Sequence, residues 1–291
     1  MIRRNLIKAI VLGGSGLVLG KVDGHSMQSF LSSALKGNIN HSVCRWTYSF
    51  LSLEELCKEV KKIGFSAIDL VGPKDWDTLK KFGIDSSMCN GAEISLTKGW
   101  NDPQYHTTLA QNYETHINLV AKAGYKNLIC FSGNRNGMAD DVGIKNTVAG
   151  LKKIMLLAEK KGVTIHMELF NSKVDHKDYM ADKSDWGIKL CQQLDSPNFK
   201  LLYDIYHMQI NEGDVIRTIQ NNHQYFGHYH TAGVPGRNEI NESQELYYPA
   251  IVKAILATGY KGYVAQEFIP TGKTNTDKIV ALKKAIKICD V

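Results

Sequence analysis

The chain has 291 residues, of which 43% are hydrophobic and 22% are charged, so it can bury the core of one large domain or two small ones. This composition excludes disordered, collagen-like and low-complexity proteins. Of the net charge of +6, +3 comes from residues 1–25, which hold four basic residues and one acidic residue. Residues 40–291 contain no basic cluster of the kind that binds many phosphates. We therefore expect a small-molecule partner and no nucleic acid; a homo-oligomer is compatible with the sequence.

The first twenty-five residues differ from the rest. Arg3 and Arg4 precede an uncharged, glycine-rich apolar run from Ala9 to Gly20, which is too short to span a bilayer as a mature helix. A basic start followed by such a segment is typical of an export signal, and Arg3-Arg4-Asn5-Leu6-Ile7-Lys8 is similar to the core of a twin-arginine signal. We expect residues 1–25 to direct export to the periplasm, with no stable membrane insertion of the mature protein. The alternative is a disordered leader on a cytoplasmic protein.

From residue 40 onward, helical stretches rich in Lys or Ala end in a glycine, an apolar residue and a short β-rich run. A glycine just after a helix adopts the left-handed conformation at low cost, and lysines suit a helix C-terminus. The junction glycines are Gly64, Gly83, Gly124, Gly162 and Gly259. The first helix has a clear start, because Ser52-Leu53-Glu54-Glu55 forms a capping box before an apolar periodicity.

These junctions delimit eight strands. In chain order they are Ser42–Trp46, Ala67–Val71, Ile84–Asn90, Asn127–Ser132, Thr164–Leu169, Phe199–Asp204, Tyr225–His230 and Gly262–Phe268. Eight strand–helix units within residues 40–291 predict one catalytic domain of the α/β class, a single (β/α)₈ TIM barrel. A doubly wound open sheet is the alternative. It requires a glycine-rich turn after the first strand, where Thr47-Tyr48-Ser49-Phe50 stands instead.

Loop lengths and cysteines add two expectations. The segments after strands three, five and seven (Gly91–Asp102, Phe170–Lys183 and Thr231–Tyr247) are much longer than the helix-to-strand turns. Long loops at the C-terminal ends of barrel strands build active sites. The six cysteines show no C-x-x-C or zinc-ribbon spacing, and most lie in apolar runs, so we expect free thiols in the core.

Four polar residues lie at the C-terminal ends of four successive predicted strands: Glu168, Asp204, His230 and Glu267. The helices between them place all four on one rim. Two glutamates, an aspartate and an imidazole form a hard ligand set for one divalent cation, with Mn²⁺, Mg²⁺ or Co²⁺ favoured and Zn²⁺ also accommodated. A lone acid at a strand end is more often a helix N-cap or an ion-pair partner, but four such residues in register favour a metal site.

The same residues resemble a known family. The stretches concerned are Gly227–Glu239, which includes Val234-Pro235-Gly236-Arg237, together with Glu168–Asn171, Tyr203–His207 and Ala265–Phe268. They are similar to the hydroxypyruvate isomerase branch of the xylose isomerase-like barrels, relatives of the ketose 3-epimerases. The resemblance covers most of residues 40–291. In that family the matching residues hold one cation, and the first and last glutamates also move protons.

The resemblance implies an isomerase or epimerase acting through a cis-enediolate, with hydroxypyruvate to tartronate semialdehyde as the first candidate reaction. A cation stabilises the negative charge of the enediolate, and Glu168 and Glu267 remove and return the carbon-bound proton. His230 stands where hydroxypyruvate isomerases tend to have Gln and the epimerases have His. A ketose 3-epimerase or aldose–ketose isomerase of a free sugar is therefore the alternative. From another class, an exported, non-catalytic sugar-binding barrel also fits.

Three further residues are candidates for substrate binding. His207, three residues after Asp204, is expected to reach a substrate hydroxyl, or else it is satisfied by its neighbours. Arg237 on the seventh loop suits a substrate carboxylate or hydroxyl, or else a loop–loop salt bridge. Trp46 walls the pocket or packs in the core.

A metal-dependent endonuclease of the apurinic-site type is the main rival within the fold. Such nucleases use three zinc ions and extra histidines after strands two and three. Here those strand ends read Val71-Gly72-Pro73 and Cys89-Asn90-Gly91-Ala92, which supply no ligands for a second or third metal.

Overall fold

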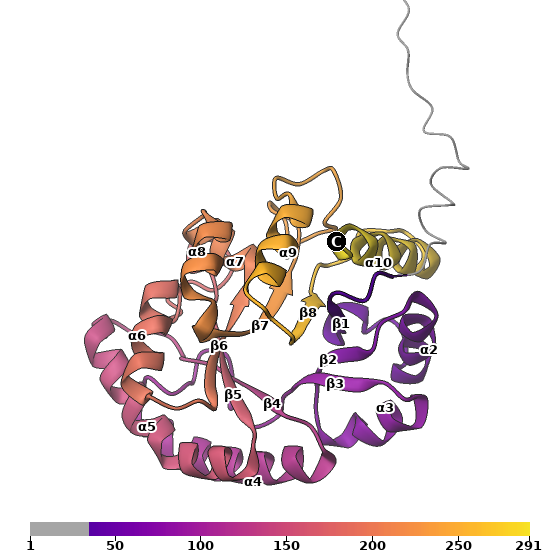
Figure 1. Ribbon diagram of the computed structural model, residues 1–291. Coiled ribbons are helices and arrows are strands. Elements are labelled where there is room, and N and C mark those ends of the chain that lie inside the picture. Colours follow the sequence, from indigo (N-terminus) through magenta and orange to yellow (C-terminus); the bar gives the residue numbers. More distant parts are fainter. Residues whose placement is uncertain (1–34) are drawn as a thin grey trace, which may run out of the picture. The chain divides into compact units, whose positions relative to one another are not determined.

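Eight strands alternate with helices and close into a parallel barrel in which each strand pairs with its neighbours in sequence (Figure 1). The computed structural model describes residues 35–291. The strands are β1 (Asn40–Cys44), β2 (Ala67–Val71), β3 (Asp85–Cys89), β4 (Asn127–Cys130), β5 (Thr164–Glu168), β6 (Phe199–Asp204), β7 (Phe226–Thr231) and β8 (Tyr263–Gln266). The α-helices are α2 (Leu53–Ile63), α3 (Trp76–Phe82), α4 (His106–Ala123), α5 (Asp140–Lys161), α6 (Ser184–Leu194), α7 (Ile205–Asn211), α8 (Val215–Asn222), α9 (Tyr248–Ala257) and α10 (Asn275–Cys289). Short 3₁₀ turns are η1 (Trp46–Tyr48), η2 (Pro73–Asp75), η3 (Pro103–Tyr105) and η4 (His223–Tyr225). The predicted (β/α)₈ barrel is confirmed.

The local signals in the sequence act as expected at the helix ends. Ser52 Oγ accepts a hydrogen bond from the Glu55 N–H over 3.2 Å, and Glu55 Oε2 accepts one from the Ser52 N–H over 2.8 Å. This capping box satisfies two amide groups at the start of α2. The helix ends at Gly64 with φ of 107°. Helices α3, α4 and α5 also end on glycines with positive φ, and Gly259 follows α9 with φ of 80°.

The barrel is closed by the pairing of its first and last strands. Ser42 of β1 is in register with Ala265 of β8. The chain is also tied beyond these strands, because the Lys36 N–H donates to both carboxylate oxygens of Asp290 at 3.0 and 2.9 Å. Asn38 Nδ2 donates to the carbonyl of Val291 over 2.8 Å. The segment before β1 and the segment after α10 are therefore hydrogen-bonded directly to each other.

The observed strand bounds differ from the predicted ones by at most two residues, and two of these shifts move candidate residues out of their strands. Strand β1 ends at Cys44, and Trp46 begins η1 instead of lying in the strand. The backbone turns there because the Tyr48 N–H bonds to the Arg45 carbonyl at 3.3 Å. Glu267 follows β8 directly, and its N–H still bonds to the Thr231 carbonyl at 2.9 Å. Both residues therefore stay on the rim.

The inside of the barrel is unusually polar. Barrel interiors are ordinarily filled by layers of branched apolar side chains. Here Asp69 of β2, His166 of β5 and His228 of β7 are fully or almost fully buried. They lie on strands that are not neighbours, yet His228 Nε2 is 2.8 Å from Asp69 Oδ2 and the two imidazole rings are 6.2 Å apart. The apolar core lies instead between the strands and the surrounding helices.

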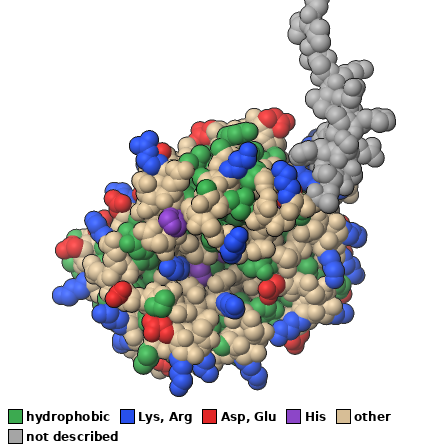
Figure 2. All heavy atoms as spheres, viewed as in Figure 1, with side chains coloured by type: hydrophobic (Ala, Val, Ile, Leu, Met, Phe, Trp, Pro, Cys, Tyr) green, Lys and Arg blue, Asp and Glu red, His purple; other side chains and the backbone are tan. Residues whose placement is uncertain are grey.

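The outer surface fits a chain with a small net charge. Figure 2 shows Lys and Arg side chains dispersed around the edge of one face, with acidic side chains between them.

The six cysteines are free and buried, as predicted. Within residues 35–291, no helix is both long and apolar enough to cross a membrane. The predicted export signal, residues 1–25, lies outside the described residues.

Candidate active site

The four residues predicted to form a metal site converge at one rim of the barrel. Glu168 and Asp204 end β5 and β6, His230 lies in β7, and Glu267 follows β8. Each has a ligand atom within 4.8 Å of those of the other three, and all four side chains are buried. The convergence follows from the pairing of parallel strands, since Asp204 and His230 are directly opposite each other in register.

His230 lies at the centre of the cluster. Its Nδ1 atom is 3.2 Å from Glu168 Oε1 and 3.0 Å from Glu267 Oε2. Three buried carboxylates beside one imidazole form a hard, negatively charged donor set, which is the chemistry that a divalent cation requires. The side chains therefore fit a bound metal ion.

The electrostatic environment gives the acidic groups different proton affinities. Burial raises the pKa of Glu168 to about 7, and burial together with the charge of Glu267 raises the pKa of Asp204 well above its usual range. Burial alone would also raise the pKa of Glu267, but His230 and Arg237 outweigh it and hold that pKa well below its usual range. Burial disfavours the charged form of His230, but the charge of Glu267 outweighs it and raises the histidine pKa. The cluster therefore combines one carboxyl group whose pKa is lowered, Glu267, with two whose pKa values are raised, Glu168 and Asp204.

Asp69 is a member of the site that the sequence analysis missed. Its Oδ1 lies 3.0 Å from His230 Nε2, and its Oδ2 accepts a hydrogen bond from Ser87 Oγ over 2.6 Å and lies 2.8 Å from His228 Nε2. These partners hold the pKa of Asp69 below its usual value despite the effect of burial. The carboxylate therefore fixes which nitrogen of His230 faces Glu168.

A signal for Asp69 is present in the sequence. It is the one charged residue in the apolar strand Ala67–Val71, and a carboxylate buried there requires partners. Asp69 lies within its strand and not at the strand end, where the four predicted ligands lie. The pairing of β2 with β3 shifts register on both sides of Asp69, and such a bulge re-aims a side chain.

A thiol also borders the cluster. Cys44 Sγ lies 3.9 Å from His230 Nε2 and 3.7 Å from Asp69 Oδ1. Burial raises its pKa well above the usual range, so the thiol is neutral and contributes no charge. The oxygen-rich group around His230 Nδ1 is therefore the better site for a hard cation.

Arg237 and Trp46, the candidates for substrate binding, both contact the carboxylate cluster. Arg237 donates from Nη2 to Glu267 Oε2 at 2.5 Å and lies 3.7 Å from Asp204 Oδ2. Its guanidinium lies over the rings of Trp46 and Tyr206, with centroids 5.2 and 5.5 Å away. Trp46 Nε1 donates to Glu267 Oε1 over 2.8 Å. Glu267 is thus held through both oxygens by side chains from two loops.

His207 lies deeper than the other candidates. It is fully buried, and its ring packs edge-on against Phe170 with centroids 4.9 Å apart. Asn171 Oδ1 accepts two backbone N–H groups, so its Nδ2 faces and donates to His207 Nδ1 over 2.7 Å. The proton of the neutral ring is therefore on Nε2, which lies 3.6 Å from Asp204 Oδ2.

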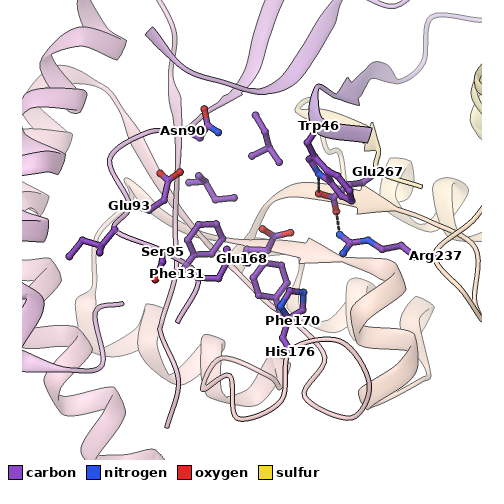
Figure 3. Close-up of a pocket in the computed structure, with 14 residues that line it drawn as sticks. Trp46, Asn90, Glu93, Ser95, Phe131, Glu168, Phe170, His176, Arg237 and Glu267 are labelled. Carbon is purple, nitrogen blue, oxygen red and sulfur yellow. Dashed lines mark hydrogen bonds and ion pairs between the residues drawn. The ribbon is translucent and has the colours of Figure 1, made fainter. Parts of the chain in front are cut away.

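A cavity of about 580 Å³ opens beside the cluster (Figure 3). Glu168, Glu267, Arg237 and Trp46 all line it. The long loops after β3, β5 and β7 contribute Glu93, Phe170 and Arg237 respectively. The expectation that these loops surround the site is therefore confirmed by the geometry.

The sequence matches one family model, described as Xylose isomerase-like TIM barrel, over residues 57–287. The chain belongs to this family.

Individual relatives of this xylose isomerase-like barrel include proteins named as isomerases and as an epimerase. It is 34% identical over 118 residues to 2-oxo-tetronate isomerase of Cupriavidus necator, covering 40% of this chain and 45% of that protein. It is 32% identical over 108 residues to a putative hydroxypyruvate isomerase of Homo sapiens, covering 37% and 39%. It is 29% identical over 242 residues to D-psicose 3-epimerase of Ruminiclostridium cellulolyticum, covering 75% and 78%. The first two matches thus span less than half of those relatives.

Solved structures share the fold of this xylose isomerase-like barrel. An AP endonuclease of family 2 from Brucella melitensis superposes with a TM-score of 0.71 at 21% identity, covering 82% of this chain and 96% of that one. The IOLI protein with a binding zinc atom superposes with a TM-score of 0.68 at 13% identity, covering 86% and 98%.

Proposed function

We propose that the protein is a metal-dependent isomerase or epimerase that moves a carbon-bound proton next to the carbonyl group of a sugar. The observation that carries the proposal is the pair Glu168 and Glu267. Both carboxyl groups are buried, both contact Nδ1 of His230, and both line the same cavity. The relatives named as isomerases and as an epimerase support this class of reaction.

The proposed metal ligands are Glu168, Asp204, His230 and Glu267. A divalent cation at this site supplies positive charge that stabilises negative charge on the substrate oxygens. The oxygen-rich set favours Mn²⁺, Mg²⁺ or Co²⁺, and Zn²⁺ is also compatible with it. The zinc atom in the IOLI protein supports a cation in this fold.

The two glutamates carry the proton. One carboxylate takes the proton from the carbon beside the carbonyl, leaving an enediolate, and a carboxylic acid returns a proton to the same or the neighbouring carbon. Return to the same carbon from the other side gives an epimer, whereas return to the neighbouring carbon, with transfer of the hydroxyl proton from one enediolate oxygen to the other, gives an isomer. Both glutamates line the cavity, so one is placed to remove the proton and the other to return it.

The substrate is proposed to be a sugar, with hydroxypyruvate as the second candidate. The charge of Arg237 already faces Glu267 and Asp204, so it is partly neutralised before any substrate carboxylate binds. The cavity volume of about 580 Å³ also favours a molecule larger than a three-carbon acid. The Val234-Pro235-Gly236-Arg237 stretch and the human relative support hydroxypyruvate.

Proton exchange with solvent tests the proposal directly. Protein loaded with Mn²⁺ is incubated in deuterated water with ketoses or with hydroxypyruvate, and deuterium at carbon is followed by NMR. Exchange that stops after chelation and returns with the metal supports the proposal. If no compound exchanges, the isomerase proposal fails and a non-catalytic sugar-binding barrel takes its place.

A further inference from the structure

The cavity has a second polar end, away from the carboxylate cluster. Figure 3 shows Asn90, Glu93 and Ser95 across the cavity from Glu267 and Arg237. This placement agrees with the topology, because β3 and β8 are three positions apart around the closed barrel. A cavity of about 580 Å³ is in the size range that encloses ligands of several rings.

The wall between the two ends is apolar and aromatic. The rings of Phe131 and Phe170 are stacked with centroids 5.7 Å apart and planes inclined by 18°. Leu70 and Ile129 line the same space. Leu70 has a φ of 56°, a strained conformation for a residue with a side chain, and such strain clusters at functional sites. Flat aromatic walls of this kind pack against the C–H faces of sugar rings.

The polar groups at the second end suit hydroxyl groups. Glu93 Oε2 accepts the backbone N–H of Gly91 over 2.8 Å, which orients the carboxylate. The side-chain amide of Asn90 lines the cavity and makes no hydrogen bond to any residue of 35–291. A carboxylate accepts hydrogen bonds from hydroxyl groups, and an amide both donates and accepts them. Together with the aromatic wall, these groups suit a ring that carries hydroxyl groups better than a simple hydrocarbon.

We infer that the cavity contains a distal subsite for a second sugar ring, so the preferred substrate is a glycosylated hydroxycarbonyl sugar and not a free monosaccharide. The subsite is formed by Asn90, Glu93, Phe131 and Phe170. The inference rests on the proposed function in placing the reacting carbonyl at Glu168 and Glu267. The inference adds the second sugar ring, which extends from the reacting sugar into the distal subsite.

Three ketoses with the same reacting end test the inference. D-Fructose is the single ring, isomaltulose carries a glucose on O6, and lactulose carries a galactose on O4; in all three, carbons 1 to 3 are free. Deuterium exchange by the metal-loaded full chain gives kcat/KM for each. We expect at least one disaccharide to exceed fructose about tenfold, since a stacked ring and one or two hydrogen bonds together contribute about that factor.

Two variants locate the effect. Asn90→Ala removes the amide, and Phe131→Leu removes the aromatic face while keeping an apolar side chain of similar size. Each is expected to lower the ratio of the disaccharide kcat/KM to the fructose kcat/KM about fivefold or more. Leu156→Ala on α5, where the side chain is 78% exposed, is the matched control and should leave the ratio unchanged.

The outcomes separate this inference from the proposed function. If fructose exchanges as well as both disaccharides, the subsite is overturned while the isomerase proposal stands. If nothing exchanges, calorimetric binding decides: disaccharide binding that Asn90→Ala and Phe131→Leu weaken supports the subsite alone. Absence of both exchange and disaccharide binding overturns both.

Discussion

Nε2 of His230 donates a hydrogen bond to Oδ1 of Asp69 over 3.0 Å, and this contact turns Nδ1 of the same ring toward Glu168 and Glu267. Asp69 belongs to β2 and His230 to β7, so the contact crosses the barrel interior. Carboxylates that accept the second N–H of a metal-binding histidine fix its tautomer and raise its basicity. We assign Asp69 this positioning role.

Replacing Asp69 by Asn is expected to weaken Mn²⁺ binding by roughly 10- to 100-fold, the usual effect of losing such a partner. Isothermal titration calorimetry measures it. Ser87→Ala removes the hydroxyl that donates to the other oxygen of Asp69 and should have a smaller effect. Unchanged affinity in a folded Asp69→Asn protein, checked by thermal unfolding, would remove Asp69 from this role.

Metal affinity should rise with pH through the neutral range. In the metal-free protein the pKa of Glu168 is raised to about 7, and the pKa values of Asp204 and His230 are also raised. A cation must displace the protons that these groups hold below that pH, so binding weakens as the pH falls. Titrations in two buffers with different ionisation enthalpies count the protons released. Release of no proton near pH 7 would contradict the expectation.

Glu168→Gln and Glu267→Gln should each lower turnover by roughly 10²- to 10⁴-fold while the barrel stays folded, because each swap keeps the shape and removes the base. Deuterium exchange measures the rate, with Glu114→Gln on the exposed surface of α4 as the matched control. Either glutamate variant that keeps more than about a tenth of the rate is not a proton carrier, given the usual size of the effect.

Arg237→Ala distinguishes the two substrate candidates. If hydroxypyruvate is the substrate, the loss of the guanidinium should raise its KM steeply while kcat falls less. If a sugar is the substrate, hydroxypyruvate is not turned over by either protein. Steady-state kinetics with both compounds decide, and an unchanged KM for hydroxypyruvate in a protein that turns it over would rule out the carboxylate contact.

We propose that residues 1–25 direct twin-arginine export, as their sequence suggests. Replacing Arg3 and Arg4 together by Lys should then retain the protein in the bacterial cytoplasm, measured by fractionation of periplasm and cytoplasm. A native protein found in the cytoplasm with these residues still attached would refute the proposal.

The sequence predicts much of this site because a closed parallel barrel places the ends of all its strands on one rim. Glu168, Asp204, His230 and Glu267 could therefore be grouped from strand ends alone. Asp69 could not, since its position depends on a bulge that only the pairing of β2 with β3 creates. The sequence also could not decide whether His207 reaches a substrate or is enclosed by its neighbours, because Phe170, which packs against it, comes from a different loop.

Hydrogen bonds join residues 36–38 to residues 290–291. The strands could therefore follow a different order along the chain while keeping the same order around the barrel. The two segments already touch, so a short linker could connect them without moving β1 or β8. The chain could then be opened at a tight turn such as Gly124, on the side of the barrel opposite the long loops. A circularly permuted barrel of this design keeps every strand neighbour and offers new ends for fusion far from the substrate cavity.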